Sequence, residues 1–237
     1  MTTRTKKSGP SIRANDRIYE EVRNGILTKR LPPGQKITEE LLAEQFGVSR
    51  TPVRSAIVRL ASDGFVEITP HSGTVVKRRL PGEIAEIYDV RALLESAAAG
   101  LCADVREAKD LSDLEQLHGT MEEIFNAAMT GGTAQIEELS LLNKRFHERI
   151  LKSCRNATLM ESASRLMEIG FLINTYVTFS REEIGRSMDD HRKLITAIQS
   201  RDVHWAECVM RSHILGARNS LMKDRVGSLG SDAAGTC

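Results

Sequence analysis

The stretch from residue 41 to residue 67, LLAEQFGVSRTPVRSAIVRLASDGFVE, constrains the fold most, because it predicts two short helices joined by a tight turn. Apolar residues at helical spacing end at Gly47, which can adopt the left-handed conformation that stops a helix. Ser49 can then accept from the free N–H groups of a second helix, and Pro52 falls in its first turn, where a missing N–H costs nothing.

The second helix has an apolar face and a basic face. Apolar residues from Val53 to Leu60 form one stripe, which leaves Arg50, Thr51 and Arg54 on the outer and leading face. The major groove of DNA admits a helix, and arginine can donate two hydrogen bonds to guanine or bind phosphate. An ordinary αα-hairpin with solvated arginines is the alternative interpretation of these residues.

The flanking segments favour DNA binding. Residues 65–77, FVEITPHSGTVVK, contain two β-branched runs separated by four turn residues, a pattern typical of a two-stranded wing. Upstream, apolar residues from Ile18 to Leu27 predict a further helix, which the sequence LPPG at residues 31–34 ends. Three helices and a two-stranded wing make a winged helix-turn-helix domain.

The stretch from Ile26 to Val76, ILTKRLPPGQKITEELLAEQFGVSRTPVRSAIVRLASDGFVEITPHSGTVV, resembles the DNA-binding domain of the GntR transcription regulators, and GVSRTPVR is its most specific part. The resemblance implies that Arg50, Thr51 and Arg54 lead the recognition helix and that the wing tip enters the adjacent minor groove. The residues expected to contact DNA are Ser49, Arg50, Thr51, Arg54, Arg59, His71, Ser72, Gly73 and Thr74. Two positions depart from the family pattern: Glu39-Glu40 stands where many members have a basic residue, and Ser55 where many have Glu.

Length and charge indicate two domains. A chain of 237 residues is long enough for two modest domains that each bury a core. Residues 1–80 contain 15 Lys and Arg against 8 Asp and Glu, a net of +7, and the rest contains 18 against 24, a net of −6. The basic part coincides with the predicted DNA-binding segment and supplies attraction to phosphate, whereas the acidic part is expected to stay off the duplex.

The pattern changes after Pro81, where proline disappears and apolar residues recur at helical spacing. Breaks are expected at Gly131-Gly132, Arg155-Asn156 and Arg201-Asp202. The pattern predicts an all-α bundle of six helices, near residues 83–104, 108–129, 134–154, 157–178, 181–200 and 203–225.

Four segments of this half resemble successive landmarks of the FCD domain, the effector-binding half of FadR-type GntR regulators. They are EIYDVRALLESAAAGL, LNKRFHERILKSCRNATLM, DDHRKLITAIQSRD and MRSHI. Six helices after a short linker resemble the VanR-like branch rather than the seven-helix form. The two resemblances together cover about residues 12 to 222.

Three histidines, His147, His191 and His213, lie on different predicted helices among apolar residues. The chain contains no HxxxH or CxxC motif, and a lone interior histidine is usually a hydrogen-bonded core residue. The resemblance implies more, because many FCD domains hold a divalent metal with three histidines and a ligand four residues before the first, here Asn143. The i, i+4 spacing places Asn143 and His147 on one helix face.

Asparagine offers a neutral oxygen where aspartate would be anionic, so a metal here is expected to bind more weakly and to be zinc or nickel. A bound ion with open positions can accept a carboxylate effector, and Arg91 is the candidate to pair with that carboxylate. The alternative for Arg91 is a structural ion pair with Asp89 or Glu95. Weaker candidates to line a cavity are Arg145, Asn174 and Tyr176.

These features predict a ligand-responsive DNA-binding transcriptional regulator, a repressor released from a palindromic double-stranded operator by a small carboxylate effector. A regulator whose effector is the metal ion itself is an alternative. A metal-dependent enzyme is a weaker one, since the chain has no nucleophile elbow and no phosphate-binding glycine loop. One helix-turn-helix reads only a half-site, so a homodimer is expected.

The domain limits follow from these boundaries. We expect a basic tail at residues 1–12, the winged helix-turn-helix at 13–79, a linker at 80–82, the helical domain at 83–226 and a disordered tail at 227–237. Four cysteines without paired spacing, no apolar run near the ~20 residues of a membrane span, and no apolar segment at the N-terminus predict a cytoplasmic protein without a membrane partner.

Overall fold

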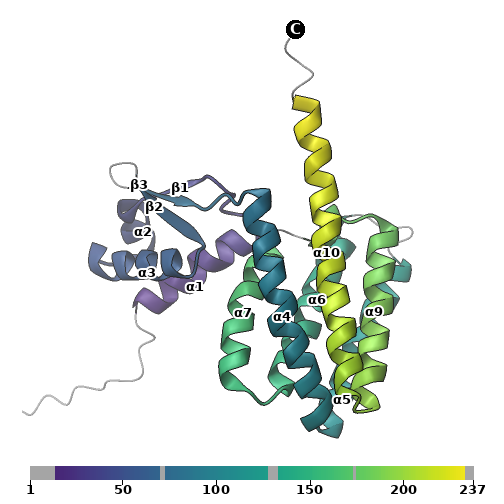
Figure 1. The fold of residues 1–237 in the computed structure, drawn as a ribbon. Coiled ribbons are helices and arrows are strands. Elements are labelled where there is room, and N and C mark those ends of the chain that lie inside the picture. Colours follow the sequence, from purple (N-terminus) through teal and green to yellow (C-terminus); the bar gives the residue numbers. More distant parts are fainter. Residues whose placement is uncertain (1–13, 70–72, 128–132, 173–174, 233–237) are drawn as a thin grey trace, which may run out of the picture. The chain divides into compact units, whose positions relative to one another are not determined.

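The computed structural model describes residues 14–69, 73–127, 133–172 and 175–232. It divides the chain into two compact units, Met1–Arg78 and Arg79–Cys237 (Figure 1). The predicted tail at residues 1–12 lies outside the described residues.

The first unit is a winged helix-turn-helix, as predicted. Its sheet has three antiparallel strands in the order β1-β3-β2, so the prediction of a two-stranded wing missed one strand. The missed strand has only two residues, too few for an alternating pattern, and it exists through its pairing with β3. The elements are α1 (Ala14–Leu27), β1 (Lys36–Ile37), α2 (Glu39–Phe46), α3 (Arg50–Ser62), β2 (Val66–Thr69) and β3 (Gly73–Val76).

The turn between α2 and α3 forms where the sequence predicts it. Gly47 has φ 63° and ψ 40°, and the N–H of Val48 donates to the carbonyl oxygen of Ala43, so the left-handed cap ends α2. Ser49 precedes α3, but its side chain makes no capping hydrogen bond among the described residues, so that predicted contact was wrong. Helix α1 packs on α3, and Ile18 of α1 and Leu60 of α3 are both 0 % exposed.

The second unit is an all-α bundle. Arg155 and Arg201 have φ 55° and 58°, so two of the expected breaks are left-handed helix ends, and Gly131-Gly132 lies outside the described residues. The helices are α4 (Pro81–Val105), α5 (Ala108–Ala127), α6 (Thr133–Ser153), α7 (Ala157–Leu172), α8 (Thr175–Thr178), α9 (Arg181–Gln199) and α10 (Val203–Asp232).

Three helix limits differ from the predicted ones. The helix expected at 157–178 is two described segments, α7 and the one-turn α8. Helix α4 begins at Pro81, inside the expected linker, because proline suits the first turn of a helix. Helix α10 continues to Asp232, into the tail expected at 227–237, because single glycines weaken a helix without necessarily ending it.

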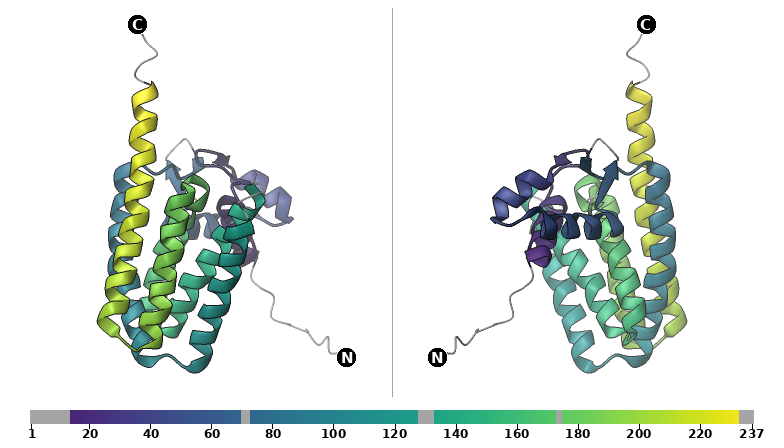
Figure 2. Two further views of the ribbon diagram at one scale, coloured as in Figure 1. Left: turned by 90° about the vertical axis from the view of Figure 1, so that its right-hand side faces the viewer. Right: turned by 90° about the vertical axis from the view of Figure 1, so that its left-hand side faces the viewer.

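The bundle core lies between α4, α5, α6, α9 and α10, and α4 and α10 run side by side (Figures 1 and 2). Its largest fully buried side chains include Tyr88, Leu114, Phe146 and Leu194. Among the helices of the described ranges, none combines the length with the apolar composition that a membrane span needs.

Candidate DNA-binding face and metal centre

The leading face of α3 presents Arg50, Thr51 and Arg54 to solvent, as expected for a recognition helix. Both arginines are paired with glutamates at the start of α2. Nε and Nη2 of Arg54 donate to the two oxygens of Glu39 over 2.9 and 2.8 Å. Nη1 of Arg50 lies 3.0 Å from Oε1 of Glu40. Sequence alone marked these glutamates as unusual for the family but did not reveal the pairing.

Ser49 and Arg59, which are also expected to contact DNA, lie at the start of α3 and on its side toward α1. Ser49 is exposed immediately before α3. Arg59 stacks its guanidinium carbon 3.9 Å from the centre of the Tyr19 ring, on the side of α3 that faces α1.

On the wing, Gly73 is exposed at the start of β3, whereas Thr74 is 7 % exposed between β1 and β2. Because its side chain is buried, Thr74 does not fit the predicted role. His71 and Ser72 lie outside the described residues.

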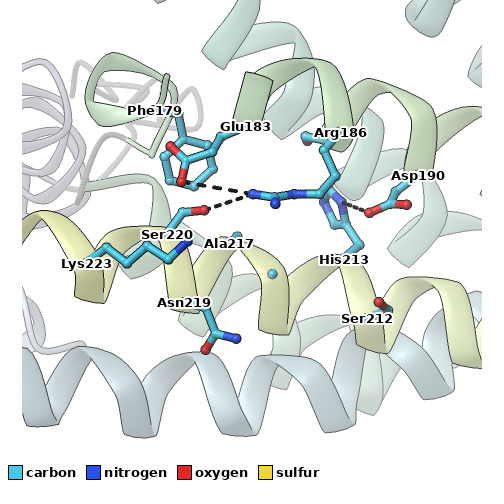
Figure 3. A pocket seen from close by; sticks show the side chains of 12 residues that line it. Phe179, Glu183, Arg186, Asp190, Ser212, His213, Ala217, Asn219, Ser220 and Lys223 are labelled. Atoms are coloured by element: carbon cyan, nitrogen blue, oxygen red, sulfur yellow. Dashed lines mark hydrogen bonds and ion pairs between the residues drawn. The ribbon is translucent and has the colours of Figure 1, made fainter. Parts of the chain in front are cut away.

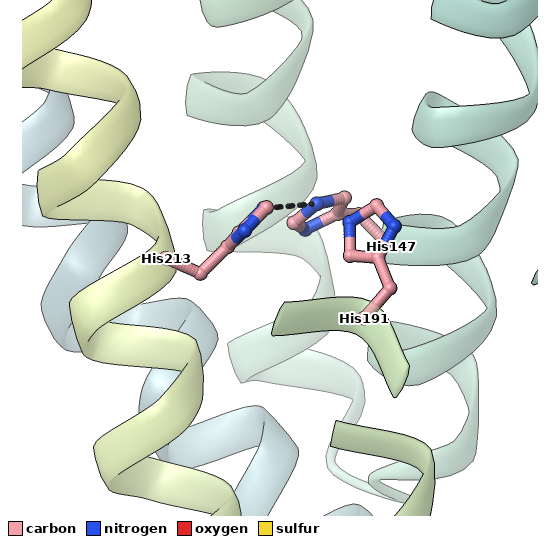
Figure 4. A group of neighbouring side chains, drawn as sticks. All are labelled: His147, His191 and His213. Atoms are coloured by element: carbon pink, nitrogen blue, oxygen red, sulfur yellow. Dashed lines mark hydrogen bonds between the residues drawn. The ribbon is translucent and has the colours of Figure 1, made fainter. Parts of the chain in front are cut away.

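The three predicted histidines meet in the buried centre of the bundle (Figure 4). His147 comes from α6, His191 from α9 and His213 from α10, and they are 2, 0 and 6 % exposed. One ring nitrogen from each lies within 4.8 Å of the others. Nε2 of His147 and Nε2 of His213 are 3.2 Å apart. Helices distant in sequence thus bring three imidazoles together.

Glu95 orients His147. Its carboxylate accepts Nδ1–H of His147 over 2.7 Å and accepts Nε–H of Arg91 over 2.7 Å. Burial raises the pKa of Glu95, but Arg91 and His147 lower it more, and the pKa falls to about 2. Because the carboxylate accepts the hydrogen bond of Nδ1–H, Nε2 is the nitrogen of His147 that faces His213.

His191 and His213 are uncharged at neutral pH. Burial, followed by the neighbouring imidazoles, lowers the pKa of His191 well below its usual value. Burial and then His147 lower the pKa of His213 to about 3. Neither ring nitrogen of His191 has a hydrogen-bond partner among the described residues. Leaving a buried polar group without a hydrogen bond lowers the stability of the fold by about 1–3 kcal/mol. A metal ion bound by a ring nitrogen of His191 would offset this cost.

Asn143 lies one turn before His147 on α6 and is 7 % exposed. Its Oδ1 accepts a hydrogen bond from the Tyr176 hydroxyl over 3.2 Å, and that hydroxyl also lies 2.6 Å from the Ser187 hydroxyl. Tyr176, a weak candidate in the sequence, thus contacts the proposed fourth ligand. The Asn143 amide oxygen is fixed in position and keeps a second lone pair.

The residues fit a divalent ion. Two imidazole nitrogens bound to one ion at about 2.1 Å, at roughly 90–110° to each other, lie about 3.0–3.4 Å apart. The 3.2 Å separation of the two Nε2 atoms matches this. Clustered buried imidazoles, one ring whose nitrogens have no hydrogen-bond partner among the described residues, and a carboxylate on the far nitrogen of one ligand are consistent with a transition-metal site.

A cavity of about 270 Å³ lies beside this cluster, between α9 and α10 (Figure 3). His213 forms part of its wall. Arg186 reaches across it, donating from Nη2 to the Ser220 hydroxyl over 3.2 Å, and Lys223 adds a second cation to the lining. Sequence reasoning missed Arg186, because nothing in the pattern of α9 shows which of its arginines borders a cavity.

Arg91 is 4 % exposed, pairs with Glu95 and stacks on Tyr88 with 4.6 Å between its guanidinium carbon and the ring centre. This is the structural ion pair that was the alternative for this residue. Arg145 lines a separate groove between α5 and α6, and Asn174 lies outside the described residues. Sequence reasoning also missed His118, whose ring centre lies 6.2 Å from that of His191.

Two family models match the two units. The one described as bacterial regulatory proteins, gntR family, matches residues 14–76, and the FCD domain matches residues 86–216. The second match alone covers more than half of the chain.

Curated relatives agree. A regulator described as an uncharacterized HTH-type transcriptional regulator in the TAR-I ttuE-ttuC' intergenic region of Agrobacterium vitis is 34% identical over 62% of this chain and 86% of its own length. The HTH-type transcriptional repressor RspR of Escherichia coli is 23% identical over 95% of this chain and 96% of its own length.

Among solved structures, E. coli McbR/YncC matches with a TM-score of 0.66 and 22% identity over 94% of this chain and 99% of that one, which supports the fold. No comparison separates the VanR-like branch from the others, so that assignment stays a prediction. The chain belongs to the GntR family of bacterial regulatory proteins, carries a C-terminal FCD domain, and is a DNA-binding transcriptional regulator rather than an enzyme.

Proposed function

We propose that this regulator is a repressor whose operator binding is controlled from the buried histidine cluster of its helical domain. The observation that carries the proposal is the convergence of three buried imidazoles, one of which has no hydrogen-bond partner among the described residues. A relative that spans nearly the same length is described as a repressor, which supports the direction of control.

A divalent ion, zinc or nickel by the preference of imidazole ligands, would be held by His147, His191, His213 and Asn143. When bound, it supplies open coordination positions to which a carboxylate can bind. The chain's own contribution is to hold Nε2 of His147 toward the site through Glu95 and to fix the Asn143 oxygen through Tyr176.

The effector is a small carboxylate that occupies the cavity beside His213. A volume of about 270 Å³ suits a small organic acid. Arg186 is the cation we assign to its carboxylate, with Lys223 beside it, because Arg186 borders the cavity, where it donates to the Ser220 hydroxyl and lies 4.0 Å from the Glu183 carboxylate. Arg91 keeps the buried Glu95 charge paired, and a carboxylate drawn to Arg91 would have to displace Glu95.

Arg50, Thr51 and Arg54 are proposed to enter the major groove, with Ser49 at the phosphate backbone and Gly73 near the wing tip. A palindromic operator and a homodimer follow from the size of one half-site. Arg59 is a weaker candidate because its guanidinium stacks on Tyr19 of α1.

A second candidate is a metal-responsive regulator. The histidine cluster favours this candidate, because the cluster does not include Arg186 or Lys223, the cations that line the cavity. Equilibrium dialysis of the protein with zinc and chelator, followed by titration with operator duplex in the presence of a panel of small carboxylates, tests both. Operator affinity that falls only when a carboxylate is added supports the proposal, and affinity that follows metal alone supports the second candidate. A protein that binds neither metal nor carboxylate contradicts both.

A further inference from the structure

The two arginines that lead α3 are paired with α2 in different ways. Arg54 makes a bidentate pair with Glu39, whose side chain is 26% exposed. Arg50 approaches a single oxygen of Glu40, whose side chain is 61% exposed. Bidentate geometry with a half-buried partner fixes a guanidinium, whereas a single contact between two solvated side chains holds it weakly.

The atoms used by Glu39 leave the base-reading edge of Arg54 available. A guanidinium is planar and carries five N–H groups, so it has a side edge formed by Nε and Nη2 and a terminal edge formed by Nη1 and Nη2. Glu39 takes the side edge. The terminal edge can still donate two parallel hydrogen bonds to O6 and N7 of a guanine.

We propose that Glu39 is a positioning residue for DNA recognition, which holds Arg54 by its side edge so that the terminal edge meets a guanine in the major groove. The inference rests on the proposed role of Arg54 as a base-contacting residue. Arginine loses rotamer freedom when it binds DNA, and a side chain already paired with Glu39 has lost part of that freedom beforehand.

The pair also favours bases over phosphates. The Glu39 charge offsets the Arg54 charge, which weakens the sequence-independent attraction to the DNA backbone. A phosphate near Arg54 meets the repulsion of the neighbouring carboxylate, whereas a guanine edge carries only partial charges. Hydrogen bonds from Arg54 lower the pKa of Glu39, so the carboxylate stays charged at neutral pH. Glu39 thereby raises the preference for a guanine-containing site over other DNA.

The test is in vitro selection from a random duplex pool with the full-length protein and three variants, Arg54→Ala, Glu39→Gln and Glu40→Gln. Glu40→Gln is the matched control, because it removes the same charge from the same turn of α2. Arg54→Ala identifies the base pair that Arg54 reads. At that base pair, Glu39→Gln is expected to reduce the guanine preference by about 5-fold or more, and Glu40→Gln to retain it.

The outcomes separate the two claims. A selected motif unchanged by Arg54→Ala overturns the assignment of Arg54 to a base. If Arg54→Ala changes the selected motif but Glu39→Gln keeps the full guanine preference at that base pair, the positioning role alone is overturned. Equal loss of preference in both glutamine variants also overturns it, since that would be an effect of charge. If Glu39→Gln lowers the thermal transition, Glu39→Asp replaces it: this variant keeps the charge but shortens the reach, and a wild-type preference in it contradicts the inference.

Discussion

The Glu95 carboxylate accepts Nδ1–H of His147 over 2.7 Å and so links α4 to α6 inside the helical domain. Its other oxygen pairs with Arg91, also over 2.7 Å. A carboxylate on the far nitrogen of an imidazole fixes the tautomer and makes the near nitrogen a better ligand. Two groups from two helices, the Arg91 guanidinium and the His147 imidazole, therefore depend on one buried side chain.

Glu95→Gln is expected to lower the affinity for zinc by about 10–100-fold, as the loss of such a partner does in other metal sites. It also leaves the buried Arg91 without a counter-charge, so the thermal transition should fall. A competition titration with a chelating dye measures the affinity. Glu122→Gln, which changes a glutamate 3.3 Å from Nε2 of His118, is the control and should bind zinc as the wild type does. Equal affinity in Glu95→Gln and wild type would contradict the role of Glu95.

Asn143→Asp is expected to strengthen metal binding, because an anionic oxygen replaces a neutral one beside His147. Without metal, the variant buries a carboxylate whose identified partner is the neutral Tyr176 hydroxyl, so it should unfold at a lower temperature than the wild type. Zinc should then raise its transition by more than it raises that of the wild type. Scanning calorimetry with and without zinc checks this, and an identical rise in both proteins would exclude Asn143 as a ligand position.

Asp110 stabilises the fold in a pH-dependent way. Burial raises its pKa, but the backbone N–H of Glu107 and the guanidinium of Arg149 lower it more, so the pKa lies below its ordinary value. Because the pKa of Asp110 is lower in the folded state, its ionised carboxylate stabilises the fold fully above the unfolded pKa of about 4. This stabilisation is lost as the pH falls through the pKa of the folded state.

Asp110→Asn should therefore unfold more easily at pH 7, by about 1–3 kcal/mol, with a smaller difference from wild type at pH 3. Urea denaturation at the two pH values measures this. A stability difference between wild type and Asp110→Asn that is larger at pH 3 than at pH 7 would contradict a lowered pKa of Asp110 in the folded state.

Two helical glycines are expected to respond oppositely to alanine. A Cβ at Gly119 of α5 would have nothing within 4 Å, so Gly119→Ala should stabilise the protein by about 0.5–1 kcal/mol through helix propensity. A Cβ at Gly170 of α7 would clash with Nη1 of Arg91, so Gly170→Ala must displace that guanidinium and should destabilise the protein. Thermal unfolding of both variants decides, and stabilisation by Gly170→Ala would contradict the placement of Arg91.

The helix breaks at Gly47, Arg155 and Arg201 were predictable because they are local signals, whereas the separation of α7 from α8 has no such signal in the apolar spacing. Strand β1 was not predictable, since two residues form it only by pairing with β3. Thr74 was assigned to DNA because it follows the expected wing tip in the chain, whereas its burial on the central strand β3 depends on tertiary packing.

The histidine cluster was indicated by family resemblance rather than by spacing. Its partner Glu95 lies 52 residues before His147, and Arg186 lies opposite Ser220 on another helix. No local pattern carries such long-range contacts. The pairing of Glu39 with Arg54 was not predicted for the same reason, although the sequence showed that Glu39 and Glu40 depart from the family pattern.

The measurement that tests the central claim most directly is an anisotropy titration of the selected operator duplex, with and without zinc and the carboxylate panel. It compares wild type, His191→Ala and His204→Ala, a control on an exposed histidine of α10. Ligands are expected to shift the operator affinity of wild type and His204→Ala by about 5-fold or more. His191→Ala should bind operator but show no shift. A shift in His191→Ala equal to that of the wild type would contradict control of DNA binding from the histidine cluster.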